Sequence, residues 1–224
     1  MKKVAIISPS YDGKIVCDHA LSLVTLFQRV AVERPDLQIS IAYWMGEALL
    51  PRARNNLFCS AFESGADAVL FLDVDQSFDP QAVLDCIDQP VAVVGVTARM
   101  KTPEERYTHR PEDNSKHVWN PSLKLLQVQY LATGFMLINR VAMQAVYDAS
   151  EVYQDGVNQR RMICNMQIRD GGMISEDIAL CEKITQAGFT LYLDPRYTCD
   201  HFGVTRHTGN YLKQLTEYRT WRGE

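Results

Sequence analysis

Two aspartates separated by one residue follow an apolar segment and could hold a divalent cation. Asp73 and Asp75 come directly after residues 68–72, which have the length and composition of a buried strand. The chain turns outward where a strand ends, so both carboxylates can converge on one point. Mg²⁺ and Mn²⁺ prefer oxygen ligands, and a diphosphate would supply the rest of an octahedral shell. A solvated turn with two aspartates is the alternative interpretation.

The charge distribution around these aspartates favours a cation. Between Arg54 and Arg99 the sequence has no Lys or Arg, yet it has seven acidic residues. A solvated acidic face would have the same composition. The net charge of the whole chain is −4, which gives no indication of non-specific nucleic-acid binding.

The first half of the chain alternates strand-like and helix-like segments. Strands are predicted over residues 3–8, 37–43, 68–72 and 91–96, and helices over 18–34, 50–64 and 80–87. This βαβαβαβ order predicts an α/β fold with a mainly parallel sheet. Ligands of such folds bind beyond the carboxyl ends of the strands, where the two aspartates fall.

The second half is less regular. Residues 99–123 and 150–172 are expected to be long polar loops, the second ending in a Gly171–Gly172 hinge. Two apolar runs occupy 128–138. Helices are predicted over 141–147, 175–187 and 208–222, and short strands over 189–193 and 197–201. We expect one domain over residues 1–224.

Composition excludes several classes of protein. Of the 224 residues, 46% are hydrophobic and 22% are charged, as in soluble globular domains. No apolar run approaches the ~20 residues that span a bilayer, and the N-terminus lacks the pattern of a signal peptide. The six cysteines have no metal-site spacing. We therefore expect reduced thiols and a cytoplasmic protein, in the host cytoplasm if a virus encodes it.

Several motifs occur together in one order. Ala53-Arg54-Asn55 is followed by Gly65, by the apolar strand and by Asp73-Val74-Asp75, and the chain opens with a strand and Pro9-Ser10-Tyr11. This order resembles that of the GT-A glycosyltransferases, nucleotide-sugar-dependent enzymes of family-two type, in a small stand-alone form. The resemblance covers about residues 3–203 and implies a GT-A, Rossmann-like α/β fold with a small antiparallel portion on the acceptor side. It divides the single domain into a nucleotide-binding half (1–98), an acceptor and catalytic half (99–203) and a C-terminal helix (204–224).

The resemblance also implies roles for residues of the second half. Gly134 lies in a segment similar to the strand that lines the donor sugar. Glu176 and Asp177 resemble the acidic motif that supplies the general base of inverting members, with Asp177 as the base and Glu176 as the second candidate. Helix capping is the alternative for both. His201 corresponds to a late histidine that serves as a third metal ligand.

A site follows from these assignments. Asp75 would bind the metal directly, and Asp73 would hold sugar or ribose hydroxyls and the metal's water shell. His201 would complete the protein ligands. The tyrosine ring can stack on a base, and Arg52 or Arg54 can add a cation at the diphosphate. Nucleotide-sugar binding is assigned to Pro9, Ser10, Tyr11, Asp12, Arg52, Arg54, Asn55, Asp73 and Gly134.

The predicted function is metal-dependent glycosyl transfer. A hexosyl or pentosyl group would move from a nucleotide-diphosphate sugar, with a UDP-sugar favoured, to an acceptor hydroxyl. Mn²⁺ or Mg²⁺ would stabilise the leaving diphosphate. The acceptor is left open between a glycan, a small molecule, a protein and a modified base in DNA. A single displacement would invert the anomeric configuration, and retention stays open.

The alternative functions are a nucleotidyltransferase and a non-catalytic nucleotide-sugar-binding module. A nucleotidyltransferase also uses a metal and a nucleotide on an α/β sheet, but its glycine-rich, basic first loop is not seen. A non-catalytic nucleotide-sugar-binding module would not need Asp73, Asp75, Asp177 and His201 together. The absence of a P-loop and of GxGxxG disfavours kinases and dehydrogenases.

Overall fold

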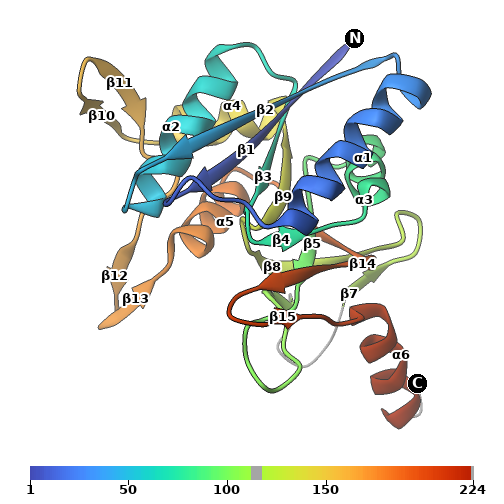
Figure 1. The fold of residues 1–224 in the computed structure, drawn as a ribbon. Coiled ribbons are helices and arrows are strands. Elements are labelled where there is room, and N and C mark those ends of the chain that lie inside the picture. Colours follow the sequence, from blue (N-terminus) through green and yellow to red (C-terminus); the bar gives the residue numbers. More distant parts are fainter. Residues whose placement is uncertain (112–117, 223–224) are drawn as a thin grey trace.

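The computed structural model describes residues 1–111 and 118–222, with side chains up to residue 217, and places helices on both faces of one mixed sheet (Figure 1). The first half alternates strands and helices as predicted. Its elements are β1 (Lys2–Ser10), α1 (Cys17–Glu33), β2 (Leu37–Met45), α2 (Leu50–Glu63), β3 (Ala68–Leu72), β4 (Gln76–Ser77), α3 (Pro80–Asp88) and β5 (Val93–Ala98).

The second half adds antiparallel strands and three helices to this framework. Its elements are β6 (His109–Pro111), β7 (Val118–Asn120), β8 (Leu125–Leu131), β9 (Phe135–Asn139), α4 (Arg140–Ala149), β10 (Val152–Asp155), β11 (Asn158–Arg161), β12 (Gln167–Arg169), β13 (Gly172–Ile174), α5 (Glu176–Gln186), β14 (Leu191–Phe202), β15 (Arg206–His207) and α6 (Tyr211–Arg222).

The central sheet has the strand order β2-β1-β3-β9-β5-β14-β8-β6. Strands β2, β1, β3, β5 and β14 run in one direction, so their carboxyl ends share one edge. Strand β9 lies between β3 and β5 and runs against both. The antiparallel β8, with β6 and β7 paired to it, forms the other end of the sheet.

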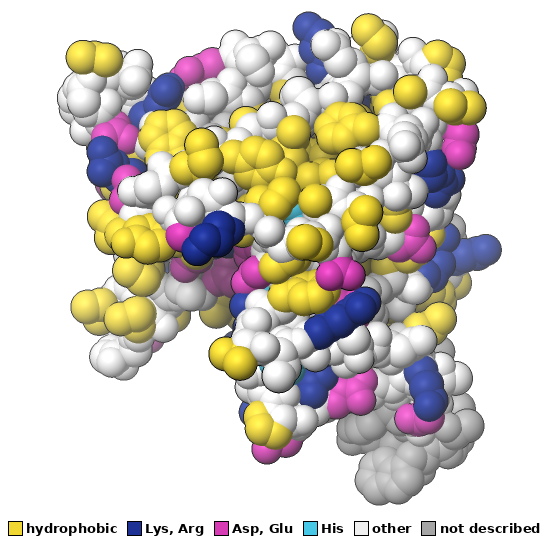
Figure 2. Space-filling view, in the orientation of Figure 1, with side chains coloured by type: hydrophobic (Ala, Val, Ile, Leu, Met, Phe, Trp, Pro, Cys, Tyr) yellow, Lys and Arg dark blue, Asp and Glu magenta, His cyan; other side chains and the backbone are white. Residues whose placement is uncertain are grey.

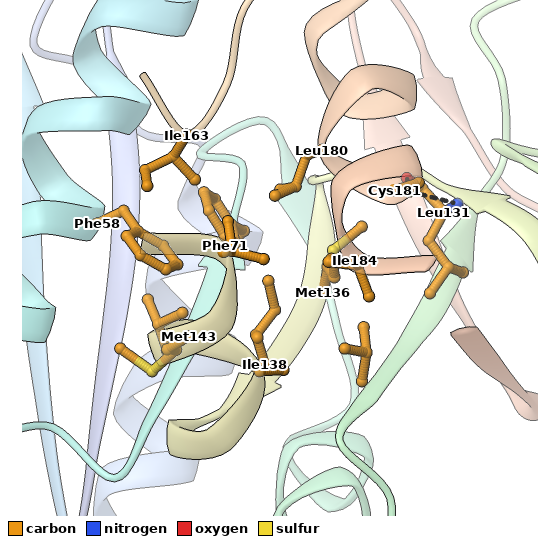
Figure 3. Close-up of a cluster of buried hydrophobic side chains, with 14 of the residues drawn as sticks. Phe58, Phe71, Leu131, Met136, Ile138, Met143, Ile163, Leu180, Cys181 and Ile184 are labelled. Atoms are coloured by element: carbon orange, nitrogen blue, oxygen red, sulfur yellow. Dashed lines mark hydrogen bonds between the residues drawn. The ribbon is translucent and has the colours of Figure 1, made fainter. Parts of the chain in front are cut away.

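Successive side chains of the buried strands point to opposite faces of the sheet, so each face has its own hydrophobic core. In β3, Val69 and Phe71 face the cluster that includes α2, α4 and α5, whereas Leu70 and Leu72 face the cluster of α1 and α3. Figure 3 shows the first cluster, with Phe58 of α2 beside Phe71. Burial of β3 on both faces explains its continuous apolar sequence.

The two segments predicted to be long loops contain short strands. Residues 150–172 form the β10–β11 hairpin and the first strand of the β12–β13 hairpin. Asp170 and Gly171, with φ angles of 52° and 77°, form the turn between β12 and β13, so the predicted Gly171–Gly172 hinge lies at a hairpin turn. Residues 99–123 contain β6 and β7, and residues 112–117 lie outside the described part of the chain.

The two short strands predicted over 189–193 and 197–201 are one strand, β14, with a register irregularity between Leu193 and Thr198. Pro195 falls at that irregularity, where a missing N–H is tolerated. Because β14 is continuous, it reaches from the core to the edge where β3 ends. Of the helices that the structure describes, none is long and apolar enough to cross a bilayer.

Candidate functional site

The turn after β3 brings Asp75 beside the end of β14. The N–H of Asp73 donates to the carbonyl of Gly134 at 3.0 Å, and the chain then turns into β4. Gln76 of β4 pairs with His201 of β14, and the N–H of Phe202 donates to the carbonyl of Asp75 at 2.8 Å. Backbone pairing therefore places the second aspartate of the motif next to His201.

Asp75 is a carboxylate between two basic groups. Its Oδ2 lies 2.5 Å from Nζ of Lys101 and 3.5 Å from Nε2 of His201. Partial burial works to raise the pKa of Asp75, but the His201 ring and the Lys101 ammonium outweigh it and lower the pKa to about 2. The group is therefore ionised at neutral pH, as a metal ligand must be.

The His201 ring is oriented as a metal-binding histidine would be. Its Nδ1 lies 3.1 Å from the carbonyl oxygen of Arg99, which can only accept, so Nδ1 donates. In the neutral ring, Nε2 then has a lone pair on the side of Asp75. A backbone carbonyl on the second ring nitrogen is the usual support of a metal-ligating histidine.

Asp73 does not join this pair through its carboxylate. Its Oδ1 accepts from Nη2 of Arg54 at 2.9 Å. Within the described residues there is no group of three or more His, Cys, Asp or Glu side chains arranged to hold a metal. The two residues of the motif set that lie together and could hold a divalent cation are Asp75 and His201, and Asp73, two positions before Asp75, is engaged with Arg54.

Arg54 connects the two acidic motifs. Its guanidinium is buried and donates to Asp73 and, at 2.5 Å, to Oε1 of Glu176 at the start of α5. Burial disfavours the charge of Arg54, but the nearby carboxylates Asp73 and Glu176 outweigh this effect and raise its pKa. The sequence predicted Arg54 as a ligand of the diphosphate, and the structure pairs it with protein carboxylates on both sides.

Asp177 has a different environment from Glu176. Its Oδ1 accepts from the Ser175 hydroxyl and, at 2.8 Å, from the N–H of Ile178. No cation in the described part of the chain forms an ion pair with it. The start of a helix favours an ionised carboxylate there. Glu176 is therefore the acid engaged with arginine, and Asp177 is the acid held only by neutral donors.

The residues predicted to contact the nucleotide lie at the carboxyl end of β1. Tyr11 is 69% exposed, whereas Ser10 is buried and donates to the carbonyl of Lys14 at 2.8 Å. Asp12 is paired with Lys14 at 3.0 Å, which lowers its pKa. Figure 2 shows apolar side chains gathered over β1 and β2, and Met45 at the end of β2 is exposed like Tyr11. An exposed ring and thioether here can contact a flat base.

Two other predicted contacts of the donor, Arg52 and Asn55, have partners within the protein. Arg52 pairs with Glu47 at 3.0 Å and with Asp155 of β10 at 2.5 Å. Asn55 is buried, and its amide exchanges two hydrogen bonds with the backbone of Cys164. The contacts with Asp155 and Cys164 attach the second half of the chain to α2.

Gly134 is in close contact with the interior rather than with open space. A Cβ there would lie 2.1 Å from Nε2 of Gln76, whose side chain is buried. Gly134→Ala must therefore displace Gln76 from behind the aspartate turn. We expect a loss of roughly 1–3 kcal/mol of stability, the usual cost of overpacking, measurable by urea unfolding. An unchanged midpoint would show that Gln76 moves freely.

Lys101 lies in the site but could not be assigned to it from the sequence. It lies in the segment that was predicted to be a loop, and no spacing relates it to the aspartates. Arg99 was missed too: its buried guanidinium donates to the carbonyls of Met100, Thr102 and Pro103 at 2.7–3.3 Å and shapes the segment that carries Lys101.

Comparison with known proteins bears on the fold. No protein-family model matches the sequence, and no curated protein matches it significantly. The structure is similar to that of A197 from STIV, with a TM-score of 0.55 and 17% identity over 91% of this chain and 86% of the other.

A second solved structure is similar over most of this chain. It is GalNAc-T7 with UDP, GalNAc and Mn²⁺, with a TM-score of 0.50 and 11% identity over 89% of this chain. The match spans 43% of GalNAc-T7, so this chain corresponds to less than half of that protein. The central sheet is mainly parallel and flanked by helices, and the carboxyl ends of its parallel strands lie at one edge. From this architecture and the two structural similarities we conclude that the chain has the GT-A glycosyltransferase fold.

Proposed function

We propose that the protein is a metal-dependent glycosyltransferase that moves a sugar from a nucleotide-diphosphate sugar, preferably a UDP-sugar, to an acceptor hydroxyl with inversion. The observation that carries the proposal is the Arg54 bridge, which brings the head of α5 to the same strand edge as Asp73 and Asp75. A metal-ligand pair and a candidate base then belong to one site. The GT-A fold supports this combination.

The donor would lie along the carboxyl ends of the parallel strands. Tyr11 would stack on the base, and Asp73 would accept hydrogen bonds from ribose or sugar hydroxyls while Arg54 holds its other side. Asp75 and His201 would hold Mn²⁺ or Mg²⁺. The cation, when bound, supplies positive charge that stabilises the leaving diphosphate.

Asp177 would act as the general base. Its Oδ1 is held by the Ser175 hydroxyl and the Ile178 N–H, which orients the carboxylate without neutralising it. The carboxylate takes the proton of the acceptor hydroxyl while that oxygen bonds to the anomeric carbon. The bond from this carbon to the diphosphate oxygen breaks in the same displacement, and the nucleoside diphosphate leaves. One displacement of this kind inverts the anomeric configuration.

We further propose that the protein works in a reducing compartment such as the cytoplasm. All six cysteines are free thiols in the structure, and five of them are buried. Secreted domains of this kind more often contain disulfides. The acceptor stays open between a glycan, a small molecule, a protein and a modified base of DNA.

Asp75→Asn tests the metal assignment. A neutral amide is a weaker ligand for a hard cation, so Mn²⁺-dependent turnover of the donor should fall by roughly 10²-fold or more. The fold should be retained, because the Asp75 and Lys101 side chains are each 36% exposed and such solvent-screened pairs contribute about 1 kcal/mol or less. The measurement is release of nucleoside diphosphate from a panel of nucleotide-sugars, with EDTA as the second condition. Full turnover in the variant or in EDTA would overturn the metal role.

A further inference from the structure

Lys101 places a permanent positive charge on the ligand oxygen of Asp75. Its Nζ lies 2.5 Å from Oδ2 of Asp75, the oxygen that also faces Nε2 of His201 at 3.5 Å. Among the described lysines and arginines, Lys101 is the one within ion-pair distance of Asp75. A cation held between this oxygen and Nε2 of His201 would compete with the ammonium for it.

The surrounding structure holds the backbone segment that carries Lys101. Buried Arg99 donates to carbonyls on both sides of Lys101 in the chain, and this segment also returns to Arg106 through the N–H of Met100 at 2.8 Å. The aliphatic stem of Lys101 passes over Gly203, where an added Cβ would meet its Cδ at 3.4 Å. The stem thus runs along the end of β14 to reach Asp75.

The chemistry of the pair explains why an ammonium lies there. A carboxylate oxygen is stabilised by a positive charge beside it, and Oδ2 of Asp75 has the Lys101 ammonium at 2.5 Å. Lys101 supplies that charge from the chain itself.

From this arrangement we propose that Lys101 is the resident cation of the Asp75–His201 pair and that a divalent cation binds by displacing it. The proposal rests on the proposed metal-dependent function. The released ammonium stays close to the site, where its three donors can pair with phosphate oxygens of the donor. Lys101 therefore weakens binding of the metal alone and favours binding of the metal together with a diphosphate.

The test is Mn²⁺ binding to the full chain without donor or acceptor, measured by calorimetry and by the electron paramagnetic resonance signal of free Mn²⁺. Lys101→Met keeps a stem over Gly203 and removes the charge, and it should tighten Mn²⁺ binding by roughly 3–10-fold. Lys101→Arg keeps the charge and should not tighten it. The matched control is Lys213→Met, which removes an exposed lysine paired with Glu217 on α6 and should leave Mn²⁺ affinity unchanged.

The double variant Lys101→Met/Asp75→Asn tests whether the gain in Mn²⁺ affinity depends on the Asp75 carboxylate. If the gain arises at Asp75, the double variant should lose it and bind Mn²⁺ no better than Asp75→Asn alone. Unchanged or weaker binding in Lys101→Met, or a gain that persists without the Asp75 carboxylate, would overturn the proposal. Because no sugar is transferred in this assay, a failure of the glycosyltransferase assignment would leave the competition measurable.

Discussion

Asp177→Asn is expected to lower the rate of sugar transfer by roughly 10²–10⁴-fold, the usual contribution of a general base, while donor binding is retained. An amide oxygen can still accept from the Ser175 hydroxyl and the Ile178 N–H, so the head of α5 should keep its structure. The amide cannot take the proton of the acceptor. Both the rate of sugar transfer and the affinity for the donor are measured. A parallel loss of both would make Asp177 a binding residue.

Glu176→Gln is the matched control for this prediction. Glu176 carries the charge that faces buried Arg54 at 2.5 Å, so its loss should lower the urea midpoint, whereas Asp177→Asn should not. If Glu176→Gln abolishes transfer with an unchanged midpoint and Asp177→Asn is active, the roles of the two acids are reversed.

Arg54→Met is expected to destabilise the protein by roughly 3–5 kcal/mol, as removal of one partner from a buried ion pair does. The Arg54 side chain is 4% exposed, and its two partners Asp73 and Glu176 are largely buried. Without the guanidinium, the carboxylates of Asp73 and Glu176 would lie in one partly buried region with no positive charge from Arg54 to offset theirs. The free energy of unfolding in urea gives the value directly.

Arg52→Met provides the comparison two residues earlier on the same helix. Arg52 pairs with Glu47 and Asp155, but its side chain is 48% exposed. Water and salt screen such pairs, so the expected loss is about 1 kcal/mol or less. Equal losses in Arg54→Met and Arg52→Met would contradict the view that Arg54 holds the two acidic motifs together through a buried bridge.

The elements near the aspartates could be predicted because local signals there agree. Residues 68–72 form β3 as predicted, since an apolar run between Gly65 and an aspartate turn has one favourable arrangement. Helix α3 forms where a helix was predicted, and Asp79 caps it by accepting from the N–H of Gln81 at 2.8 Å. Periodicity, caps and breakers are local, so they could be found from one sequence.

The insertion of β9 between β3 and β5 could not be predicted in this way. Its apolar run fits any buried strand, and its direction depends on pairing with two strands distant in sequence. The polar hairpins β10–β11 and β12–β13 lack the apolar alternation that marks a strand, so they were predicted as loops.

Contacts within the site depend on the same long-range pairing. Arg54 and Glu176 are 122 positions apart and meet because α2 and α5 lie on one face of the sheet. Resemblance to a family suggested the separate motifs, but not that Arg54 joins them or that Lys101 lies on Asp75. The roles of the site residues in binding and catalysis stay predictions.

The most direct measurement is a crystal structure of the protein soaked with Mn²⁺ and a panel of nucleotide-sugars, with anomalous scattering used to locate the metal. We predict Mn²⁺ bound by Asp75 and His201 and by the donor diphosphate, the base beside Tyr11, and Lys101 withdrawn from Asp75. The anomeric carbon should face Asp177. A donor bound away from the carboxyl ends of β1 and β3, or Mn²⁺ bound without Asp75, would contradict the account.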